Sequence, residues 1–380
     1  MSTLHTNDEM DSCLHVIVPL LLDWYDRNAR SLPWRDEPTP YRVWISEIML
    51  QQTRVEAVKP YFARFIADLP DLHALATCPQ EQLFKLWEGL GYYSRARNLQ
   101  KAARAVEVQN GGRLPASYDE LLALPGIGSY TAGAIASIAF GIPVPAVDGN
   151  VLRVISRVLA RTDDILDPKV KRRMETELSA VLPTDRPGDF NQSLMELGAT
   201  VCLPRGQAKC LVCPLREICE ANRLGLVSEL PKKRAKQPRK IETRTVFVLF
   251  TADHRVILCQ RPRSGLLAGL WEFPCAEGLL EPQAAEAALS GWGLTVTQLE
   301  PLGEARHIFT HIEWQMTGYI AQISDPIALP AGWVAIDLMD ARDTYTIPSA
   351  YKAYTEILFA TLPKVAQEDH RFVWRTETVE

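Results

Sequence analysis

The sequence predicts two domains, a mainly α-helical domain followed by an α+β domain. Three observations lead to this fold class. The chain has 380 residues, more than one hydrophobic core usually serves. Helical patterns fill residues 12–222, and β-rich patterns follow residue 242. With 47% hydrophobic and 23% charged residues, the composition is that of a globular protein and excludes a disordered chain.

Changes in composition give the expected boundaries. We expect an N-terminal tail over 1–11, a helical domain over 12–228, a basic linker over 229–242, an α+β domain over 243–370 and a C-terminal tail over 371–380. The linker, ELPKKRAKQPRKIE, has two prolines, six basic residues and little apolar surface to bury.

Helix start signals recur through the first domain. Thr39–Pro40 fits an N-cap followed by proline at the first helical position, and Ser117 with Glu120 fits a capping box. Ser94 precedes a long amphipathic stretch that ends at Asn110–Gly111. We expect no strand in this domain.

The second domain mixes the two periodicities. We expect strands over 243–250, 255–261 and 311–323, and helices over 282–290 and 348–361. There are no internal repeats.

The net charge of −5 argues against a protein coated in positive charge but allows local basic surfaces for phosphates. Basic residues gather within 95–104, at helical spacing within 153–161, and within 232–240. For each cluster, the alternative is a solvated helix face or linker.

No stretch approaches the roughly 20 apolar residues that span a bilayer. The acidic start of the chain also lacks the basic region of a signal peptide. We therefore expect a cytoplasmic protein, nucleoid-associated if bacterial, that is monomeric and has no membrane partner.

Four of the eight cysteines are clustered, at Cys202, Cys210, Cys213 and Cys219. In a reducing compartment such a cluster indicates a metal site rather than disulfides. Four thiolates suit tetrahedral zinc or a [4Fe–4S] cluster, and their spacing does not choose between the two.

The segment LPGIGSYTAGAI, residues 124–135, combines a glycine-rich turn with the start of a helix. Gly126 and Gly128 lack Cβ, so the turn can point backbone N–H groups outward where the helix dipole favours an anion. The segment fits a phosphate cradle. It also fits a plain connection between two packed helices.

Two carboxylates are placed for acid and electrostatic roles. Asp148 begins DGN and fits a helix N-cap, which we expect to lower its pKa and keep it ionised, whether it stabilises a cation or only caps. Glu47 lies on an apolar helix, where burial raises the pKa and leaves an acid available at neutral pH. The alternative for Glu47 is a structural ion pair with Arg54 or another basic residue.

An acidic glutamate and an ionised aspartate together can cleave a glycosidic bond through an oxocarbenium-like state. A base within DNA must first be flipped out and the gap filled. The segment GLGYYSRARNL, residues 89–99, offers Leu90 and Tyr92 as exposed apolar wedges beside the phosphate-binding cations Arg95 and Arg97. Packing in the core is the alternative for Leu90 and Tyr92.

Together these segments resemble the helix-hairpin-helix DNA glycosylases, and within them the MutY family of adenine DNA glycosylases. The motifs occur in family order: LPWR (32–35), SEIMLQQT (46–53), GLGYYSRARNL, LPGIGSYTAGAI, VDGNVLRV (147–154) and the four cysteines. A Nudix-like domain follows the linker. The first cysteine interval is seven residues here and six in most of the family.

The resemblance implies a role for each candidate residue. Glu47 protonates adenine at N7, Asp148 stabilises the developing sugar cation, and Tyr130 and Asn150 organise the site. The cysteines hold [4Fe–4S], with zinc as the alternative. The implied binding residues are Gly126 and Gly128 for the DNA backbone, Trp34, Arg35 and Gln192 for adenine, and Gln52, Leu90 and Tyr92 for filling the helix near 8-oxoguanine.

The implied partner is double-stranded DNA that contains adenine opposite 8-oxoguanine. One alternative is an endonuclease III-like glycosylase-lyase, which needs a lysine amine where this chain has Tyr130; a phenol cannot form the imine. The sequence therefore favours hydrolysis without strand cleavage. A second alternative is a lesion-binding protein whose carboxylates are only structural.

GLWEFP, residues 269–274, resembles Nudix pyrophosphatases, whose reaction needs a helix dense in glutamates to hold divalent metal. The next stretch offers only Glu281 and Glu286. The resemblance thus implies a module that recognises the 8-oxoguanine strand. The family's Phe-Ser-His probing loop corresponds to Phe309, Thr310 and His311, although His311 is also consistent with a plain surface histidine.

Overall fold

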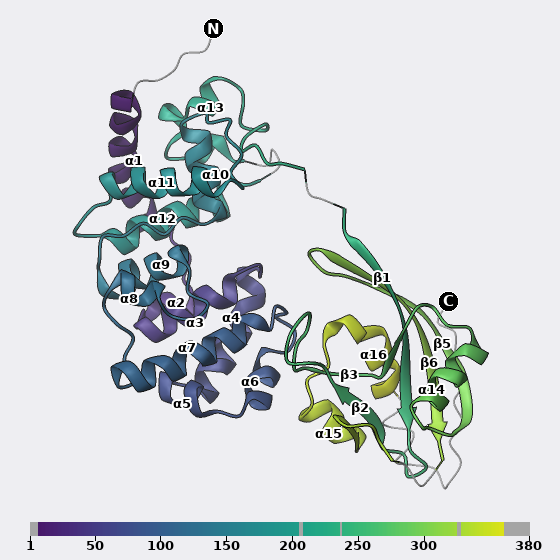
Figure 1. The fold of residues 1–380 in the computed structure, drawn as a ribbon. Helices are drawn as coiled ribbons and strands as arrows, with labels where there is room; N and C mark the ends of the chain where they lie inside the picture. Colours follow the sequence, from purple (N-terminus) through teal and green to yellow (C-terminus); the bar gives the residue numbers. More distant parts are fainter. Residues whose placement is uncertain (1–6, 205–207, 236–237, 325–327, 361–380) are drawn as a thin grey trace. The chain divides into compact units, whose positions relative to one another are not determined.

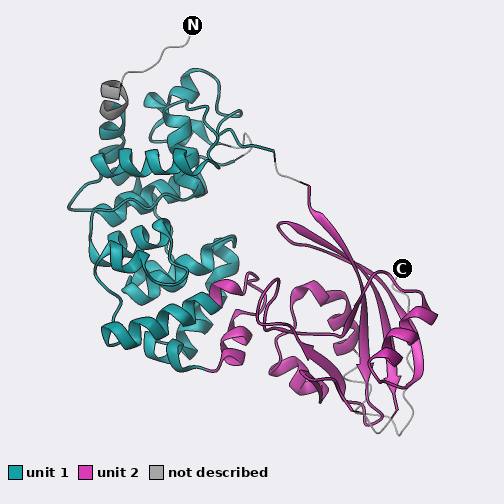
Figure 2. Cartoon of the chain, viewed as in Figure 1, with its two compact units in different colours: residues 1–78, 97–236 teal, residues 79–96, 237–380 magenta. Residues whose placement is uncertain are grey.

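The computed structural model describes residues 7–204, 208–235, 238–324 and 328–360. The chain forms two compact units (Figure 2): unit 1 comprises residues 1–78 and 97–236, and unit 2 comprises residues 79–96 and 237–380. Most of the predicted helical domain is in unit 1, but residues 79–96 group with unit 2. The predicted C-terminal tail, 371–380, and residues 1–6 of the predicted N-terminal tail lie outside the described residues.

Unit 1 is helical (Figure 1), and among its described residues there is no strand beyond one isolated bridge between Asp164 and Lys232. Its helices are α1 (Asn7–Asn28), α2 (Pro33–Asp36), α3 (Pro40–Leu50), α4 (Val55–Asp68), α5 (Leu72–Thr77), α8 (Tyr118–Leu122), α9 (Ser129–Phe140), α10 (Gly149–Val158), α11 (Pro168–Val181), α12 (Pro187–Thr200) and α13 (Glu220–Arg223), with 3-10 turns η1 (Cys210–Val212) and η2 (Arg216–Ile218). Helix α7 (Ser94–Asn110) begins in unit 2 and continues into unit 1.

The predicted start signals are confirmed. Thr39 Oγ1 accepts a hydrogen bond from the Arg42 amide at 3.3 Å, and Ser117 Oγ accepts one from Glu120 at 3.5 Å. Helix α1 begins earlier than predicted, at Asn7, because its first turns are polar and lack the apolar period used to find it. No helix among the described residues is both long enough and apolar enough to cross a membrane.

The small residues of α9 allow close packing in the core of unit 1. Gly133 faces the segment before α10, and a Cβ at this position would lie 2.3 Å from the Pro145 carbonyl oxygen. Helices α1, α10, α11 and α12 supply one continuous core, in which Ile155 and Phe190 are fully buried. This packing fixes the N-terminus of α10, where Asp148 lies.

Unit 2 is built on one seven-stranded mixed sheet with the path β3-β2-β1-β6-β5, to which β4 and β7 add at β1 and β2. Strand β1 pairs parallel with β6 and antiparallel with β2. The elements are α6 (Gln80–Trp87), β1 (Lys240–Phe250), β2 (Val256–Gln260), β3 (Trp271–Glu272), β4 (Cys275–Glu277), α14 (Pro282–Gly291), β5 (Val296–Ile308), β6 (Ile312–Ile323), β7 (Trp333–Ile336), α15 (Leu338–Asp343), η3 (Ser349–Tyr351) and α16 (Lys352–Ala360).

Both faces of this sheet are covered. Side chains alternate along β1, so Val246 and Val248 pack with α15 and α16, whereas Phe247 and Leu249 pack with α14. The predicted strands and helices are confirmed, and β1 begins at Lys240, inside the predicted linker. Strand β5 was not predicted, because it is largely solvent-accessible and its pairing is irregular between Pro301 and Gly303.

Candidate active site

One cavity of about 590 Å³ in unit 1 gathers residues predicted from separate motifs. Its volume is within the range of small-molecule sites and leaves room for a nucleoside. Helices α2, α3, α9, α10 and α12 contribute to its walls. The predicted residues that line it are Trp34, Arg35, Glu47, Gln52, Tyr130, Asp148, Asn150 and Gln192.

Glu47 is the acid of this cavity. Its side chain is buried on α3 and accepts a hydrogen bond from the Tyr130 hydroxyl of α9. Burial raises the pKa of Glu47 to about 7, although the Tyr130 hydrogen bond acts to lower it. The partner of Glu47 in a direct contact is thus Tyr130, and the positive charge that acts on its carboxyl group is that of Arg35.

Asp148 is the N-cap of α10, as predicted. Its Oδ1 accepts from the backbone amides of Asn150 and Val151, both at 2.8 Å, and its Oδ2 accepts from Asn150 Nδ2 at 2.7 Å. The expected lowering of its pKa is wrong: burial raises the pKa of Asp148, and the hydrogen bonds of the cap offset this only in part. A cap motif is visible in a sequence, whereas the loss of solvent is not.

Asn150 is held by a chain of contacts that begins at the cysteine loop. Arg153 donates from Nη2 to Asn150 Oδ1 at 2.7 Å and to the Gly198 carbonyl at 2.8 Å, and from Nε to the Cys202 carbonyl at 2.8 Å. Because arginine only donates, the Asn150 oxygen must face Arg153 and its amide nitrogen Asp148. The Cys202 carbonyl is therefore linked to Asp148 through the side chains of Arg153 and Asn150.

The arginines of α10 were expected to face solvent or phosphate, and this expectation is wrong for Arg153 and Arg157, which are both buried. Arg157 donates to Cys202 Sγ at 3.2 Å, to the Leu203 carbonyl at 2.7 Å and to the Leu230 carbonyl at 2.9 Å. Arginine spacing alone cannot show that a folded loop covers the helix face.

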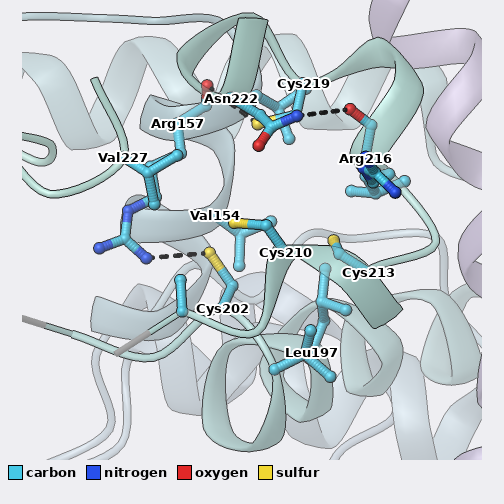
Figure 3. Close-up of a pocket in the computed structure, with 14 residues that line it drawn as sticks. Val154, Arg157, Leu197, Cys202, Cys210, Cys213, Arg216, Cys219, Asn222 and Val227 are labelled. Atoms are coloured by element: carbon cyan, nitrogen blue, oxygen red, sulfur yellow. Dashed lines mark hydrogen bonds between the residues drawn. The ribbon is translucent and has the colours of Figure 1, made fainter. Parts of the chain in front are cut away.

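Four thiols surround one pocket behind α10 (Figure 3), those of Cys202, Cys210, Cys213 and Cys219. Burial raises the pKa of Cys213 to about 12, so a cation is needed to make it a thiolate. Among the described residues no group of three or more His, Cys, Asp or Glu side chains is arranged to hold a single metal ion. All four thiols line this one pocket, and four thiolates suit a [4Fe–4S] cluster or tetrahedral zinc.

The glycine-rich turn lies just before α9. Gly126 has φ +78°, and a Cβ there would lie 2.5 Å from the Asn98 Cβ, so glycine is required. Gly128 is the exposed N-cap of α9, and a Cβ there would meet nothing. Neither glycine lines the cavity, but Lys171 does, and its Nζ donates to Ser129 Oγ at 3.0 Å at the start of α9.

Two of the residues predicted to fill the DNA helix, Gln52 and Tyr92, share an unusual backbone conformation. Gln52 in unit 1 has φ +62° and Tyr92 in unit 2 has φ +48°, a region that side chains other than glycine rarely adopt and that is common at functional sites. Tyr92 is 49% exposed. Leu90, predicted as an exposed wedge, is buried instead.

Arg95 was also expected to face phosphate but is buried. Its Nη2 donates to the carbonyls of Leu90 and Gly91 at 3.0 and 3.1 Å, so it supports the loop that presents Tyr92.

The predicted probing residues form the turn between β5 and β6 of unit 2. Thr310 and His311 are exposed, and Thr310 Oγ1 lies 2.9 Å from the Tyr92 hydroxyl of the same unit.

Comparison with known proteins identifies the family of each domain. Residues 45–180 match the HhH-GPD superfamily of base excision DNA repair proteins, and residues 245–356 match the NUDIX domain. The adenine DNA glycosylase of Rattus norvegicus is 38% identical over 351 residues, which cover 77% of this chain and 68% of the relative. The chain belongs to the adenine DNA glycosylase family.

The adenine DNA glycosylase of Homo sapiens is likewise 38% identical, over 375 residues that cover 82% of this chain and 68% of the relative. The structure of a thermostable thymine-DNA glycosylase superposes with a TM-score of 0.52 at 28% identity and covers 56% of this chain and 98% of its own. As an adenine DNA glycosylase of base excision repair, the chain is a hydrolase with a helical HhH-GPD domain and a Nudix-like domain.

Several charged residues of the glycosylase cavity were not predicted from the sequence. Arg30, Lys171 and Glu196 line it and carried no prediction. The signal that singled out Glu47, a charged residue among apolar neighbours on a helix, also applies to Glu196 in FNQSLMELGA. No comparable signal marks Arg30 or Lys171.

Proposed function

We propose that the protein hydrolyses the N-glycosidic bond of adenine paired with 8-oxoguanine in double-stranded DNA and leaves the strand intact. The observation that carries this proposal is the pairing of Glu47 with Asp148 in one cavity of nucleoside size. Family membership supplies adenine as the base. The two carboxyl groups supply the chemistry.

In this mechanism, Glu47 is the general acid. A pKa of about 7 leaves a large protonated fraction at neutral pH, so the carboxyl group can give its proton to N7 of the flipped adenine as the bond breaks. Tyr130 holds the carboxyl group in place through its hydroxyl. Positive charge then develops on the sugar, and water completes the hydrolysis at C1′.

Asp148 stabilises that positive charge in its ionised form. Its two oxygens are fixed by the N-terminus of α10 and by Asn150, so no reorganisation is needed as the charge develops. An adjacent carbocation also favours the ionised form, against the effect of burial. Tyr130 occupies the position at which a lyase needs an amine, which supports hydrolysis without strand cleavage.

The four clustered cysteines are proposed to hold a [4Fe–4S] cluster, whose part is structural: it clamps the loop that follows α12. Arg153 and Arg157, which are part of α10, donate hydrogen bonds to Cys202 and so connect this loop to the helix. In unit 2, Tyr92, Thr310 and His311 are proposed to contact the 8-oxoguanine strand. We also propose that the protein is a monomer located in the cytoplasm, and associated with the nucleoid if it is bacterial.

The carboxylate roles are tested with Glu47→Gln and Asp148→Asn, which keep size and lose the acid or the charge. We expect each variant to bind an A:8-oxoguanine duplex as the wild type does and to release adenine at least about a hundredfold more slowly in single-turnover kinetics. Glu177→Gln, outside the cavity, serves as the control. Adenine release at the wild-type rate by either variant contradicts the mechanism.

A further inference from the structure

A buried ion-pair network lies beside the catalytic pair. Glu196 of α12 is 1% exposed and lines the cavity. Its carboxylate accepts from Arg30 Nε at 2.5 Å, from Arg30 Nη2 at 3.0 Å and from Arg35 Nη2 at 2.9 Å. Burial acts to raise the pKa of Glu196, but the two arginines together lower it, so the group is a carboxylate.

Arg35 is held by this network through all three of its side-chain nitrogens. Its Nη2 binds Glu196, its Nη1 donates to the Arg30 carbonyl at 3.0 Å, and its Nε donates to Gln192 Oε1 at 2.9 Å. With all three nitrogens bound, the planar guanidinium has a single orientation. Three of the five N–H donors of Arg35 are therefore used by protein groups, and Arg35 still lines the cavity.

The orientation of Gln192 follows from that of Arg35. Arginine has no acceptor, so the atom of Gln192 that faces Nε must be the amide oxygen. The amide nitrogen then lies on the other side of the group. Within the described residues it has no protein partner, and Gln192 lines the cavity. The amide nitrogen of Gln192 is thus available as an N–H donor to a molecule bound in the cavity.

We propose that Glu196 is a positioning residue for base recognition: through Arg35 it holds Gln192 so that the amide nitrogen donates to a ring nitrogen of the flipped adenine. This inference rests on the proposed function, in which Glu47 protonates N7 of adenine. The remaining ring acceptors of adenine are N1 and N3. Guanine carries a hydrogen on N1, so a fixed donor at that position selects adenine over guanine.

Single-turnover excision from duplexes carrying adenine, 1-deazaadenine or 3-deazaadenine opposite 8-oxoguanine tests the inference. Removing a ring nitrogen also changes the reactivity of the base. The decisive quantity is therefore the change in the adenine-to-deazaadenine rate ratio between wild type and variant. Gln192→Leu removes the donor and leaves the ion pairs. Glu196→Gln removes the charge that holds Arg35.

For one of the two analogues, we expect the rate ratio to fall about tenfold or more in Gln192→Leu and in Glu196→Gln, because a lost hydrogen bond in a dry pocket has that effect on the rate. Duplex affinity, which depends mainly on phosphate contacts, stays unchanged. Arg35→Lys, which keeps the charge but loses the fork, gives the same result if Glu196→Gln does not fold. Glu177→Gln, whose ion pair with Arg161 lies outside the cavity, keeps the wild-type ratio.

Equal ratios in wild type and Gln192→Leu for both analogues overturn the donor assignment. A wild-type ratio in Glu196→Gln together with a lowered melting temperature shows that Glu196 is only structural and overturns its positioning role. If the wild type releases no adenine at all, the proposed function fails first, and the inference fails with it.

Discussion

The acidity of Glu47 comes from its surroundings. A solvent-exposed glutamate is ionised at neutral pH, whereas this one is buried beside Asp148 and has a pKa of about 7. Tyr130 opposes the shift, because its hydrogen bond stabilises the ionised carboxylate. The tyrosine thus orients the acid and also limits how far its pKa rises.

This arrangement predicts a pH profile. The reaction needs protonated Glu47, so the excision rate falls as pH rises through about 7. Tyr130→Phe removes a contact that lowers the pKa, and the alkaline limb then moves to higher pH. Single-turnover rates across the pH range measure both effects, with Tyr61→Phe, outside the cavity, as the control. An unchanged or downward-shifted limb in Tyr130→Phe contradicts the account.

At the residue scale, the sequence predicted a catalytic role where a charged side chain stands among apolar neighbours. Glu47 was found because a charge on an apolar helix is costly unless it is partnered or neutral. The pKa of Asp148 was misjudged, since the depth of its burial depends on α12, which packs against α10. Leu90 and Arg95 were misplaced for the same reason: exposure is a property of the fold.

At the scale of elements, α10 joins the cysteine loop to the catalytic carboxylate. Its first turn holds Asp148 and Asn150, its second carries Arg153, and α12 approaches so closely that Gly198 leaves no room for a Cβ beside Asn150. A Cβ on Gly198 would lie only 2.6 Å from the Asn150 Cβ. Glycine at this position therefore sets the distance between the two helices.

Gly198→Ala is expected to push Asn150 away from Asp148. Because Asn150 Nδ2 donates to Asp148 Oδ2, the carboxylate loses a fixed partner, and we expect excision to slow about tenfold or more. Gly291→Ala, at an open position of α14, is the matched control. Single-turnover kinetics and thermal melting of both variants separate the effects: unaltered excision by Gly198→Ala refutes the packing argument.

The sequence predicted helices and turns well where the signal lies within a few residues of the element. Helix caps at Thr39, Ser117 and Asp148 and the glycine turn at Gly126 are encoded within a few residues. Strand β5 has no such local signal, because its extended conformation depends on pairing with β6. The role of Arg153 likewise depends on a loop some fifty residues later in the chain.

At the scale of the whole molecule, unit 2 has a Nudix-like sheet, and its helix α14 offers few carboxylates for a metal ion. On α14 the only acidic side chain is Glu286, which is exposed, and Glu281 precedes the helix. The buried Glu272 is already engaged by Arg261, at 2.5 Å, and by the Tyr351 hydroxyl. Its carboxylate is a structural partner in the core of the unit.

We therefore expect no Mg²⁺-dependent hydrolysis of 8-oxo-dGTP by the full chain. Divalent metal needs several carboxylates with free oxygens, and α14 does not supply them. Pyrophosphate release, measured with an active Nudix pyrophosphatase as the positive control, checks this expectation. Hydrolysis that Glu286→Gln abolishes would show that unit 2 is an enzyme in its own right.

Adenine release without strand cleavage is tested most directly by a single-turnover assay on a duplex with one A:8-oxoguanine pair, labelled on the adenine strand and divided between alkaline and neutral work-up. We expect strand breaks only after alkali, because Glu47 and Asp148 release the base and no amine occupies the position of Tyr130. Breaks after neutral work-up would reveal a lyase, through Lys171 or another amine, and contradict the claim of hydrolysis alone. Breaks in neither sample would contradict the catalytic roles of both carboxyl groups.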